Sequence, residues 1–211
     1  DQKKKHYLVW DGKGLKNMTA SIKVPLYDEE HDTPSNPSPY GIMAWHAEVS
    51  FVYVYDRYDV WKVDPTLKKA PQKLVSGRAQ KNIFRYVKVD PEERFITSGQ
   101  ILYFRVQNAS TKVSNIYFVT PSGKKARWLR PYSKYHYAVF QKARDANAFL
   151  YSRENYLSSP NLFVVKTAHN NFEKLTSEDV AAIQLTDLNP QQEDYIWGTA
   201  ELYKWTALNG K

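Results

Sequence analysis

A short strand pattern that occurs three times most constrains the fold of this chain. Each copy begins with a polar residue that favours turns and continues with an apolar residue, an aromatic residue, any residue and valine. The copies are residues 59–63, 115–119 and 161–165, so their starts are 56 and 46 residues apart. A leucine follows each start after 14 or 15 residues, namely Leu74, Leu129 and Leu175. This spacing indicates repeated units of about fifty residues.

Each unit has the pattern of an antiparallel meander. An aromatic-rich strand precedes each copy, at residues 51–55, 101–106 and 149–151. In the first unit Asp64-Pro65 ends the strand, because proline cannot donate to a sheet ladder, and another strand follows at 73–75. Strands repeated with such a period, without helices, are typical of propeller blades. We predict an all-β fold, an incomplete β-propeller with about three four-stranded antiparallel blades plus a partial blade. A generic β-sandwich is the alternative.

Alternating or aromatic-rich stretches predict the remaining strands. They lie at residues 6–10, 15–22, 42–49, 80–90, 94–106 with a break at 98–99, 132–139, 149–153, 172–175 and 195–207. Residues 25–40 contain four prolines and a charge cluster, which predicts a loop. Residues 177–179 are a possible start for a short turn of helix.

Length and composition place the chain among ordinary globular proteins. Its 211 residues suffice for one all-β domain with a sizeable core, and 16 Tyr, 9 Phe and 6 Trp supply large sheet-facing side chains. The absence of cysteine excludes a disulfide framework and a thiolate metal site. No apolar run has membrane-spanning length, so we expect no membrane partner. The opening residues 1–5 do not resemble a signal peptide.

The net charge of +8 raises the possibility of nucleic-acid binding. The basic residues are scattered, however, over residues 3–5, 68–69, 78–85 and 124–130. Such dispersed charges are expected on solvated turns and strand faces, and net charge alone governs solubility and nonspecific binding. We therefore expect no nucleic-acid partner.

Two stretches contain residue types that bind ligands. Asp28, Glu29, Glu30, His31 and Asp32 form the densest acidic group, but their spacing matches no EF-hand or zinc pattern, which favours a solvated loop over a metal site. Residues 132–139 are rich in aromatics and, with nearby Arg130, have the chemistry to stack on a base or sugar. Sheet packing is the more common role of such a cluster.

The chain shows no local signature of catalysis. It has no G-x-S-x-G elbow, and its five histidines (His6, His31, His46, His136 and His169) form no H-E-x-x-H pair. Ser122-Gly123-Lys124 lacks the upstream glycine of a phosphate loop. Asn17 and Asn108 each begin an N-x-S/T glycosylation pattern, which by itself is weak. We predict no catalytic residue, no metal site and no cofactor in this chain, and the substrate-contacting residues stay unknown.

Several segments resemble the prolyl oligopeptidase family of serine peptidases. Residues 189–211, NPQQEDYIWGTAELYKWTALNGK, resemble the junction at which the β-propeller of that family ends and its α/β-hydrolase domain begins. Residues 159–164 and 173–176 look like the last blade. Residues 39–42 and 53–65 resemble bacterial members of the dipeptidyl/acylaminoacyl peptidase type. The likeness covers nearly the whole chain, and its motifs are specific at 53–65 and 189–211.

The resemblance implies that residues 1–192 are C-terminal blades of a propeller and residues 193–211 are its last strand and the junction. In that family a Ser-Asp-His triad lies in the hydrolase domain, so none of its members is expected here. The chain would gate and dock peptide substrates for that domain, with self-association possible through open blade edges. The surroundings of Glu29-Glu30 do not resemble the paired glutamates with which dipeptidyl peptidases hold the substrate amine. A periplasmic or secreted location is favoured over a cytoplasmic one. The alternative is a stand-alone propeller or sandwich that recognises a protein or a glycan.

Overall fold

The computed structural model describes residues 3, 5–48, 51–128, 135–166, 182–199, 201, 203, 205–208 and 210. These residues form an all-β protein whose only helical segments are the short 3-10 helices η1 (Arg78–Gln80) and η3 (Pro190–Asp194). Within these ranges no helix is long and apolar enough to cross a membrane. The predicted Phe172–Leu175 strand and the short helix at 177–179 lie outside the described residues, as does most of 132–135.

The first sheet, sheet I, contains the unit with the clearest sequence pattern. Its strands β3 to β6 form an antiparallel meander, as the alternation and the turn residues predicted. Strand β8 adds to the β3 edge in parallel. The strands are β3 (Ile42–His46), β4 (Val52–Tyr55), β5 (Val60–Val63), β6 (Gln72–Val75) and β8 (Phe95–Ile96).

Sheets II and III repeat this four-stranded antiparallel arrangement. Sheet II has the order β11-β10-β9-β7 and sheet III the order β12-β13-β14-β15. Sheet II consists of β7 (Asn82–Val87), β9 (Leu102–Asn108), β10 (Ser114–Val119) and β11 (Ala126–Trp128). Sheet III consists of β12 (His136–Lys142), β13 (Ala148–Asn155), β14 (Ser158–Lys166) and β15 (Ile183–Gln184). A two-stranded sheet of β1 (Leu8–Trp10) and β2 (Leu15–Asn17) precedes them.

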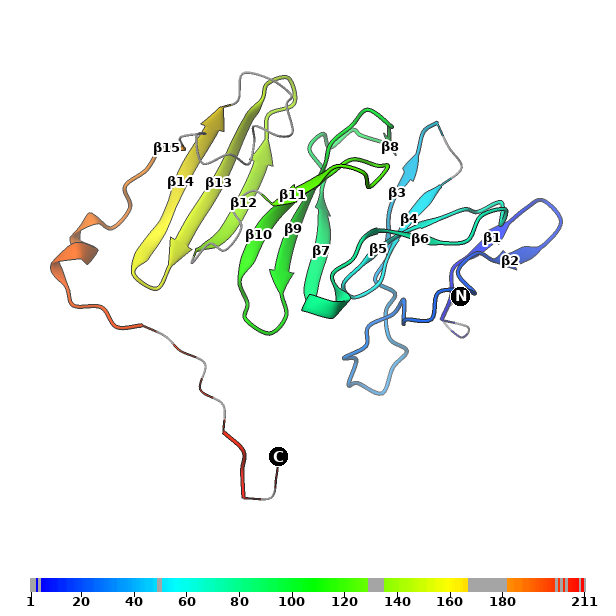
Figure 1. Ribbon diagram of the computed structural model, residues 1–211, viewed down its shortest axis with the longest axis horizontal. Coiled ribbons are helices and arrows are strands. Elements are labelled where there is room, and N and C mark those ends of the chain that lie inside the picture. The colour runs from blue at the N-terminus through cyan, green and yellow to red at the C-terminus, as the bar shows by residue number, and fades with distance from the viewer. Residues whose placement is uncertain are drawn as a thin grey trace.

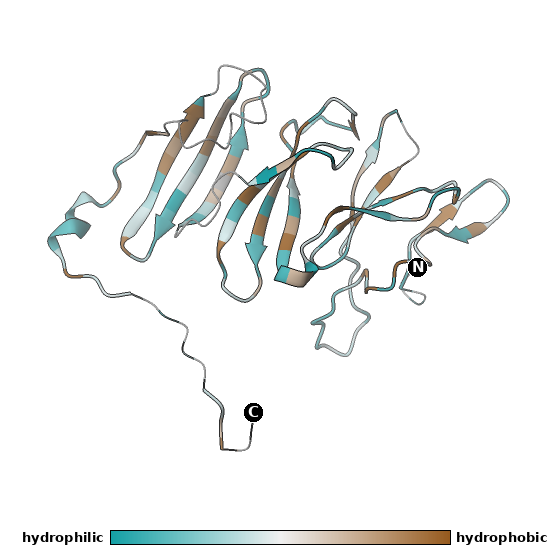
Figure 2. Cartoon of the chain, viewed as in Figure 1, coloured by the Kyte–Doolittle hydropathy of each residue, from teal (hydrophilic) through white to brown (hydrophobic). Residues whose placement is uncertain are grey.

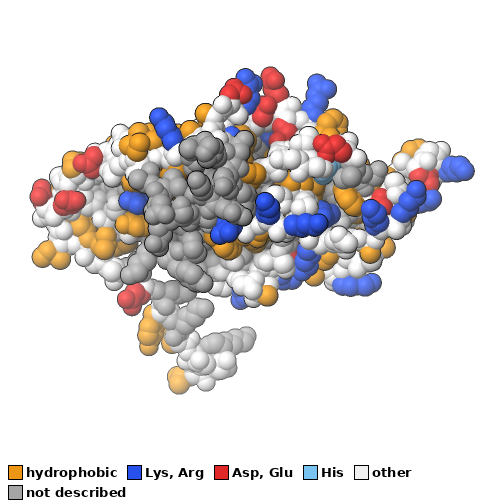
Figure 3. Space-filling model, turned by 45° about the horizontal axis from the view of Figure 1, so that its top comes forward, with side chains coloured by type: hydrophobic (Ala, Val, Ile, Leu, Met, Phe, Trp, Pro, Cys, Tyr) orange, Lys and Arg blue, Asp and Glu red, His pale blue; other side chains and the backbone are white. Residues whose placement is uncertain are grey.

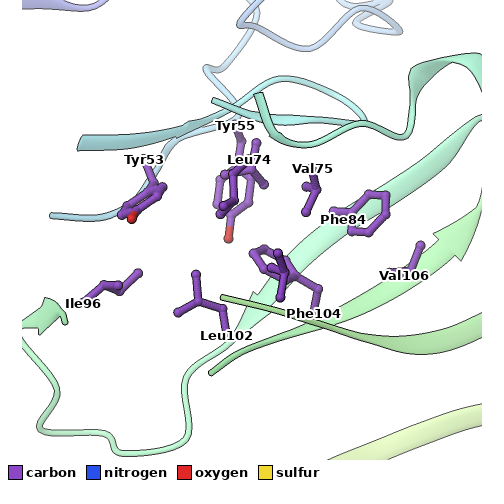
Figure 4. Close-up of a cluster of buried hydrophobic side chains, with 11 residues drawn as sticks. Tyr53, Tyr55, Leu74, Val75, Phe84, Ile96, Leu102, Phe104 and Val106 are labelled. Carbon is purple, nitrogen blue, oxygen red and sulfur yellow. The ribbon is translucent and has the colours of Figure 1, made fainter. Parts of the chain in front are cut away.

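The three sheets lie side by side in a row, with β1 and β2 beyond sheet I (Figure 1). Hydrophobic residues concentrate on the strands (Figure 2). One buried cluster lies between residues 18–26 and sheet I, a second between sheets I and II, and a third between sheets II and III. Figure 4 shows the second, in which Tyr53 and Tyr55 face Leu102 and Phe104. Each sheet is thus stabilised mainly by its neighbours. The described residues do not close into a ring.

Two sequence predictions need correction. The aromatic strand predicted over 195–207 is wrong for the described residues of that segment, which follow η3 and form no strand. A period-2 pattern needs a neighbouring strand to supply hydrogen bonds, and this segment has none in the described part of the chain. The strand predicted at 15–22 ends at Asn17, because residues 18–21 turn and bring Met18 and Ile22 into the core beside sheet I.

The meander topology places alternate connections at one end of the sheets. We call this end the loop rim: residues 25–41, 56–59, 76–81, 109–113, 156–157 and 185–199. The backbone N–H of Ala109 donates to the carbonyl of Lys81 at 2.8 Å, which joins two of these loops. The C-terminal segment also leaves sheet III at this end (Figure 1). The loop rim therefore contains alternate strand connections of the three sheets and the start of the C-terminal segment.

Candidate functional site

The β6–β7 connection, residues 76–81, organises the loop rim between sheets I and II. It contains η1 and returns the chain from the outer edge of one sheet to the start of the next. Arg78 at the start of η1 belongs to an ion-pair network, whereas Ser76 and Gln80 line a groove. The candidate site therefore has two adjoining parts.

Arg78 is the centre of the ion-pair network. Its guanidinium donates from two nitrogens to the two carboxylate oxygens of Glu29, at 3.0 and 3.1 Å, and donates to Asp56 Oδ1 at 3.2 Å. Partial burial disfavours the charge, but Glu29 and Asp56 outweigh that effect and raise the pKa of Arg78. The bidentate geometry fixes the proline-rich loop 25–40 against sheet I.

Asp56 is fully buried and acts as a structural acceptor. Its Oδ1 accepts from the backbone N–H groups of Tyr58 and Asp59 at 2.7 and 2.9 Å. Its Oδ2 accepts from the Trp61 indole N–H at 2.8 Å. The side chain thereby shapes the β4–β5 turn. Because these bonds use both carboxylate oxygens, Asp56 is suited to holding the rim rather than to moving a proton.

The first residue of the repeated pattern has a role that its turn preference did not reveal. Asp59 Oδ1 accepts from the backbone N–H groups of Gly77 and Arg78 at 2.7 and 3.0 Å. In the third unit, Asn161 Oδ1 accepts from the backbone N–H of Leu188 at 2.7 Å. Both side chains tie the start of the third strand of a sheet to the segment that leaves its fourth strand. Two of the three copies of the repeat therefore share a stabilising contact as well as a sequence pattern.

Two glutamates of the acidic group at residues 28–32 form ion pairs with arginines. Glu30 is ion-paired with Arg57 at 2.5 Å, and Glu29 is held by Arg78. His31 Nε2 lies 2.9 Å from the carbonyl of Ser35, within the same loop. In the ranges that the structure describes, no three His, Asp or Glu side chains are grouped as a metal ion requires. On the face shown in Figure 3, basic and acidic side chains both occur, spread over the surface.

The second part of the site is a groove on one face of sheet II, bordered by the β6–β7 connection and the β9–β10 turn. Its volume is about 770 Å³, within the range of ligand-binding clefts. It is lined by Ser76, Gln80, Asn82, Phe84, Val106, Asn108, Thr111, Val113, Asn115, Tyr117 and Trp128. None of these side chains is charged at neutral pH. The pairing register explains the aromatic wall, because Tyr117 and Trp128 are direct cross-strand partners.

The aromatic wall consists of three rings in mutual contact. The ring centres of Tyr117 and Trp128 are 4.9 Å apart, those of Phe84 and Tyr117 5.2 Å, and those of Phe84 and Trp128 6.0 Å. The first two pairs meet edge to face, an arrangement that the ring quadrupoles favour. Burial raises the pKa of Tyr117, so its hydroxyl stays protonated at neutral pH. Sequence analysis did not identify this groove, because its lining comes from four strands and two loops.

The described part of the predicted aromatic stretch 132–139 packs within the sheets. Tyr137 is buried between sheets II and III and contacts the ring of Tyr151. His136 Nδ1 lies 2.9 Å from the Ser114 hydroxyl, and Arg153 lies over the Tyr135 ring. Sheet packing, the more common role of such clusters, thus accounts for these residues. Arg130 and residues 132–134 lie outside the described ranges.

Comparison of the chain with protein-family models, with curated proteins and with solved structures found no match.

Proposed function

We propose that the chain is part of the β-propeller of a serine peptidase of the prolyl oligopeptidase family and docks peptide substrates for a catalytic domain. Sheets I, II and III correspond to three blades in this proposal, and β1 with β2 to a partial blade. Support comes from their matching strand order, from the core clusters between successive sheets, and from the shared contact of Asp59 and Asn161. The choice of the prolyl oligopeptidase family in this proposal comes from the sequence resemblance at residues 53–65 and 189–211.

The observation that carries the proposal is the C-terminal segment. Tyr195 is 67% exposed and Trp205 is 74% exposed, and Ile196, Tyr203 and Leu208 are also exposed. Exposed apolar side chains gathered in one segment mark a surface that packs against another structure. The segment leaves sheet III at the loop rim (Figure 1), so that partner would lie over the rim. A hydrolase domain there would face both the ion-pair network and the groove.

The gene itself offers the test of this proposal. We expect the coding DNA beyond Lys211 to continue in frame into a hydrolase sequence with a G-x-S-x-G elbow. The 211-residue chain alone should cleave none of a panel of chromogenic dipeptide amides, because it holds no nucleophile elbow. A stop codon directly after Lys211, or cleavage blocked by a serine-reactive inhibitor, would contradict the proposal.

The groove favours a second candidate function, a stand-alone binding module for a protein or a glycan. Its volume, aromatic wall and uncharged polar lining are those of a ligand cleft. A stop codon after Lys211 would favour this candidate. Under the peptidase proposal the same groove lies beside the docked substrate.

A further inference from the structure

The groove on sheet II offers hydrogen-bonding groups that the protein leaves free. Within the described part of the chain, no partner bonds to the Gln80 carboxamide, the Tyr117 hydroxyl or the Trp128 indole N–H. Asn82 uses only its Oδ1, which accepts from Asn108 Nδ2 at 3.0 Å, so its amide N–H groups stay available. These groups are positioned to bond to a ligand in the groove.

Asn108 holds neighbouring lining residues in place, and both polar atoms of its side chain are already hydrogen-bonded. Its Nδ2 donates to the Gln80 carbonyl at 2.7 Å and to Asn82 Oδ1. Its Oδ1 accepts from the backbone N–H groups of Ser110 and Thr111 at 3.0 and 2.9 Å. Asn108 therefore preorganises the Asn82 amide and the backbone at Gln80, which lowers the entropy lost when a ligand binds.

The chemistry of the lining narrows the class of ligand. A quarter of the residues in this chain are charged, yet no charged side chain lines the groove, which argues against phosphate, nucleic acid and acidic peptides. The three aromatic rings are packed too closely to enclose an ammonium group. Strands β9 and β10 are paired on both sides within sheet II, so a peptide could pair with the sheet only at its edges, β7 and β11. The uncharged lining therefore favours a neutral ligand that bonds to the side chains of the groove.

We propose that this groove binds a neutral saccharide. The ring C–H groups of a pyranose carry partial positive charge and fit against the faces of Tyr117 and Trp128. Each saccharide hydroxyl can both donate and accept a hydrogen bond. It can therefore bond to either end of the Gln80 carboxamide and accept from the N–H groups of Asn82 and Trp128. The inference rests on the groove alone and holds whether or not a catalytic domain adjoins the rim.

Isothermal titration calorimetry tests the proposal. Chitotetraose (as its N-acetylated form), cellotetraose and maltotetraose are titrated separately into the chain, up to about 10 mM, at which a site with a Kd of about 1 mM is about 90% occupied. An acetylated, amidated Ala-Ala-Phe-Ala peptide is the neutral comparator. We expect at least one saccharide to bind and the peptide not to bind. Heat from the peptide alone, or from none of the four, overturns the proposal.

Substitutions of groove residues test whether the saccharide binds in the groove. Gln80→Ala should weaken saccharide binding about fivefold, the effect of one lost neutral hydrogen bond. Trp128→Phe, which keeps an aromatic ring in the wall, should also weaken it. Gln107→Ala is the matched control, because Gln107 is an exposed amide that follows Val106 on β9 and points to the opposite face of sheet II. Melting temperatures confirm that each variant is folded. Saccharide binding unchanged by both groove substitutions overturns the assignment of the site.

Discussion

Asp59 accepts a hydrogen bond of 2.7 Å from the backbone N–H of Gly77, although the two residues lie 18 positions apart. The contact joins the β4–β5 turn to the β6–β7 connection and is buried. Lys73 neutralises the second carboxylate oxygen at 2.6 Å. A buried carboxylate is stable only with such partners. Asp59 therefore ties two loops of the rim to each other.

Asp59→Ala should destabilise the protein by about 2–4 kcal/mol, because the buried N–H of Gly77 and the partly buried N–H of Arg78 lose their acceptor and Lys73 loses its ion-pair partner. Urea unfolding followed by circular dichroism measures the loss. Asp145→Ala removes an exposed carboxylate paired with exposed Arg144 and should change stability by less than about 0.5 kcal/mol. Equal effects of the two substitutions would show that the Asp59 contact is dispensable.

Gly77→Ala should also destabilise the fold. A Cβ at position 77 would lie 2.0 Å from the Asn82 carbonyl oxygen and 2.8 Å from the Phe84 ring. The backbone cannot yield without moving the start of β7, so the melting temperature should fall by several degrees. Gly14→Ala is the control, since a Cβ there meets nothing within 4 Å. A Gly77→Ala variant as stable as wild type would mean that the connection is free to shift.

The Arg78–Glu29 pair should show a coupling energy of about 1 kcal/mol in a double-mutant cycle with Arg78→Ala and Glu29→Ala, because its geometry is bidentate and partly buried. The Arg57–Glu30 pair, whose Glu30 side chain is mostly exposed, should couple by less than about 0.5 kcal/mol. Chemical unfolding of the four variants of each cycle provides the energies. A larger coupling for Arg57–Glu30 would contradict the assignment of Arg78 as the centre of the network.

The contribution of Asp64 to the free energy of unfolding should be lost in acid. Hydrogen bonds from the Thr66 hydroxyl and from backbone N–H groups, including those of Thr66 and Lys69, lower the pKa of Asp64. Its contribution is complete above the unfolded pKa of about 3.9 and is lost as the pH falls through the lower folded value. Asp64→Asn should therefore be less stable at pH 7, with a difference from wild type that shrinks below about pH 4. A difference between Asp64→Asn and wild type that stays constant from pH 7 to about pH 2 would contradict this role of Asp64.

Hydrogen exchange should distinguish the C-terminal segment from the sheets. Residues 196–199, 201, 203 and 205–206 form no strand, so their amides should exchange rapidly in dilute protein, whereas those of 60–63 should be protected. Protection that rises with protein concentration would identify a second copy as the partner of the segment. Strong protection of 201–206 at every concentration, equal to that of 60–63, would contradict the proposed junction.

Local sequence patterns predicted much of the strand structure. The strand expected at 60–63 is β5, and the break expected at 98–99 separates β8 from β9. Alternation, β-branched residues and turn residues are short-range signals, and they act wherever consecutive strands pair. The same signals missed β11 and β15, whose three and two residues are too short to show a period.

The sequence by itself determined that the chain folds as β-strands in repeated antiparallel units, because these depend on residues close together in the chain. Only the tertiary structure decided that β8 crosses to the edge of sheet I, that Asp59 binds Gly77, and that Phe84, Tyr117 and Trp128 form one wall. It also left residues 195–199 without a strand partner. These features depend on which distant segments are brought together when the sheets pack, and burial of apolar surface sets that choice.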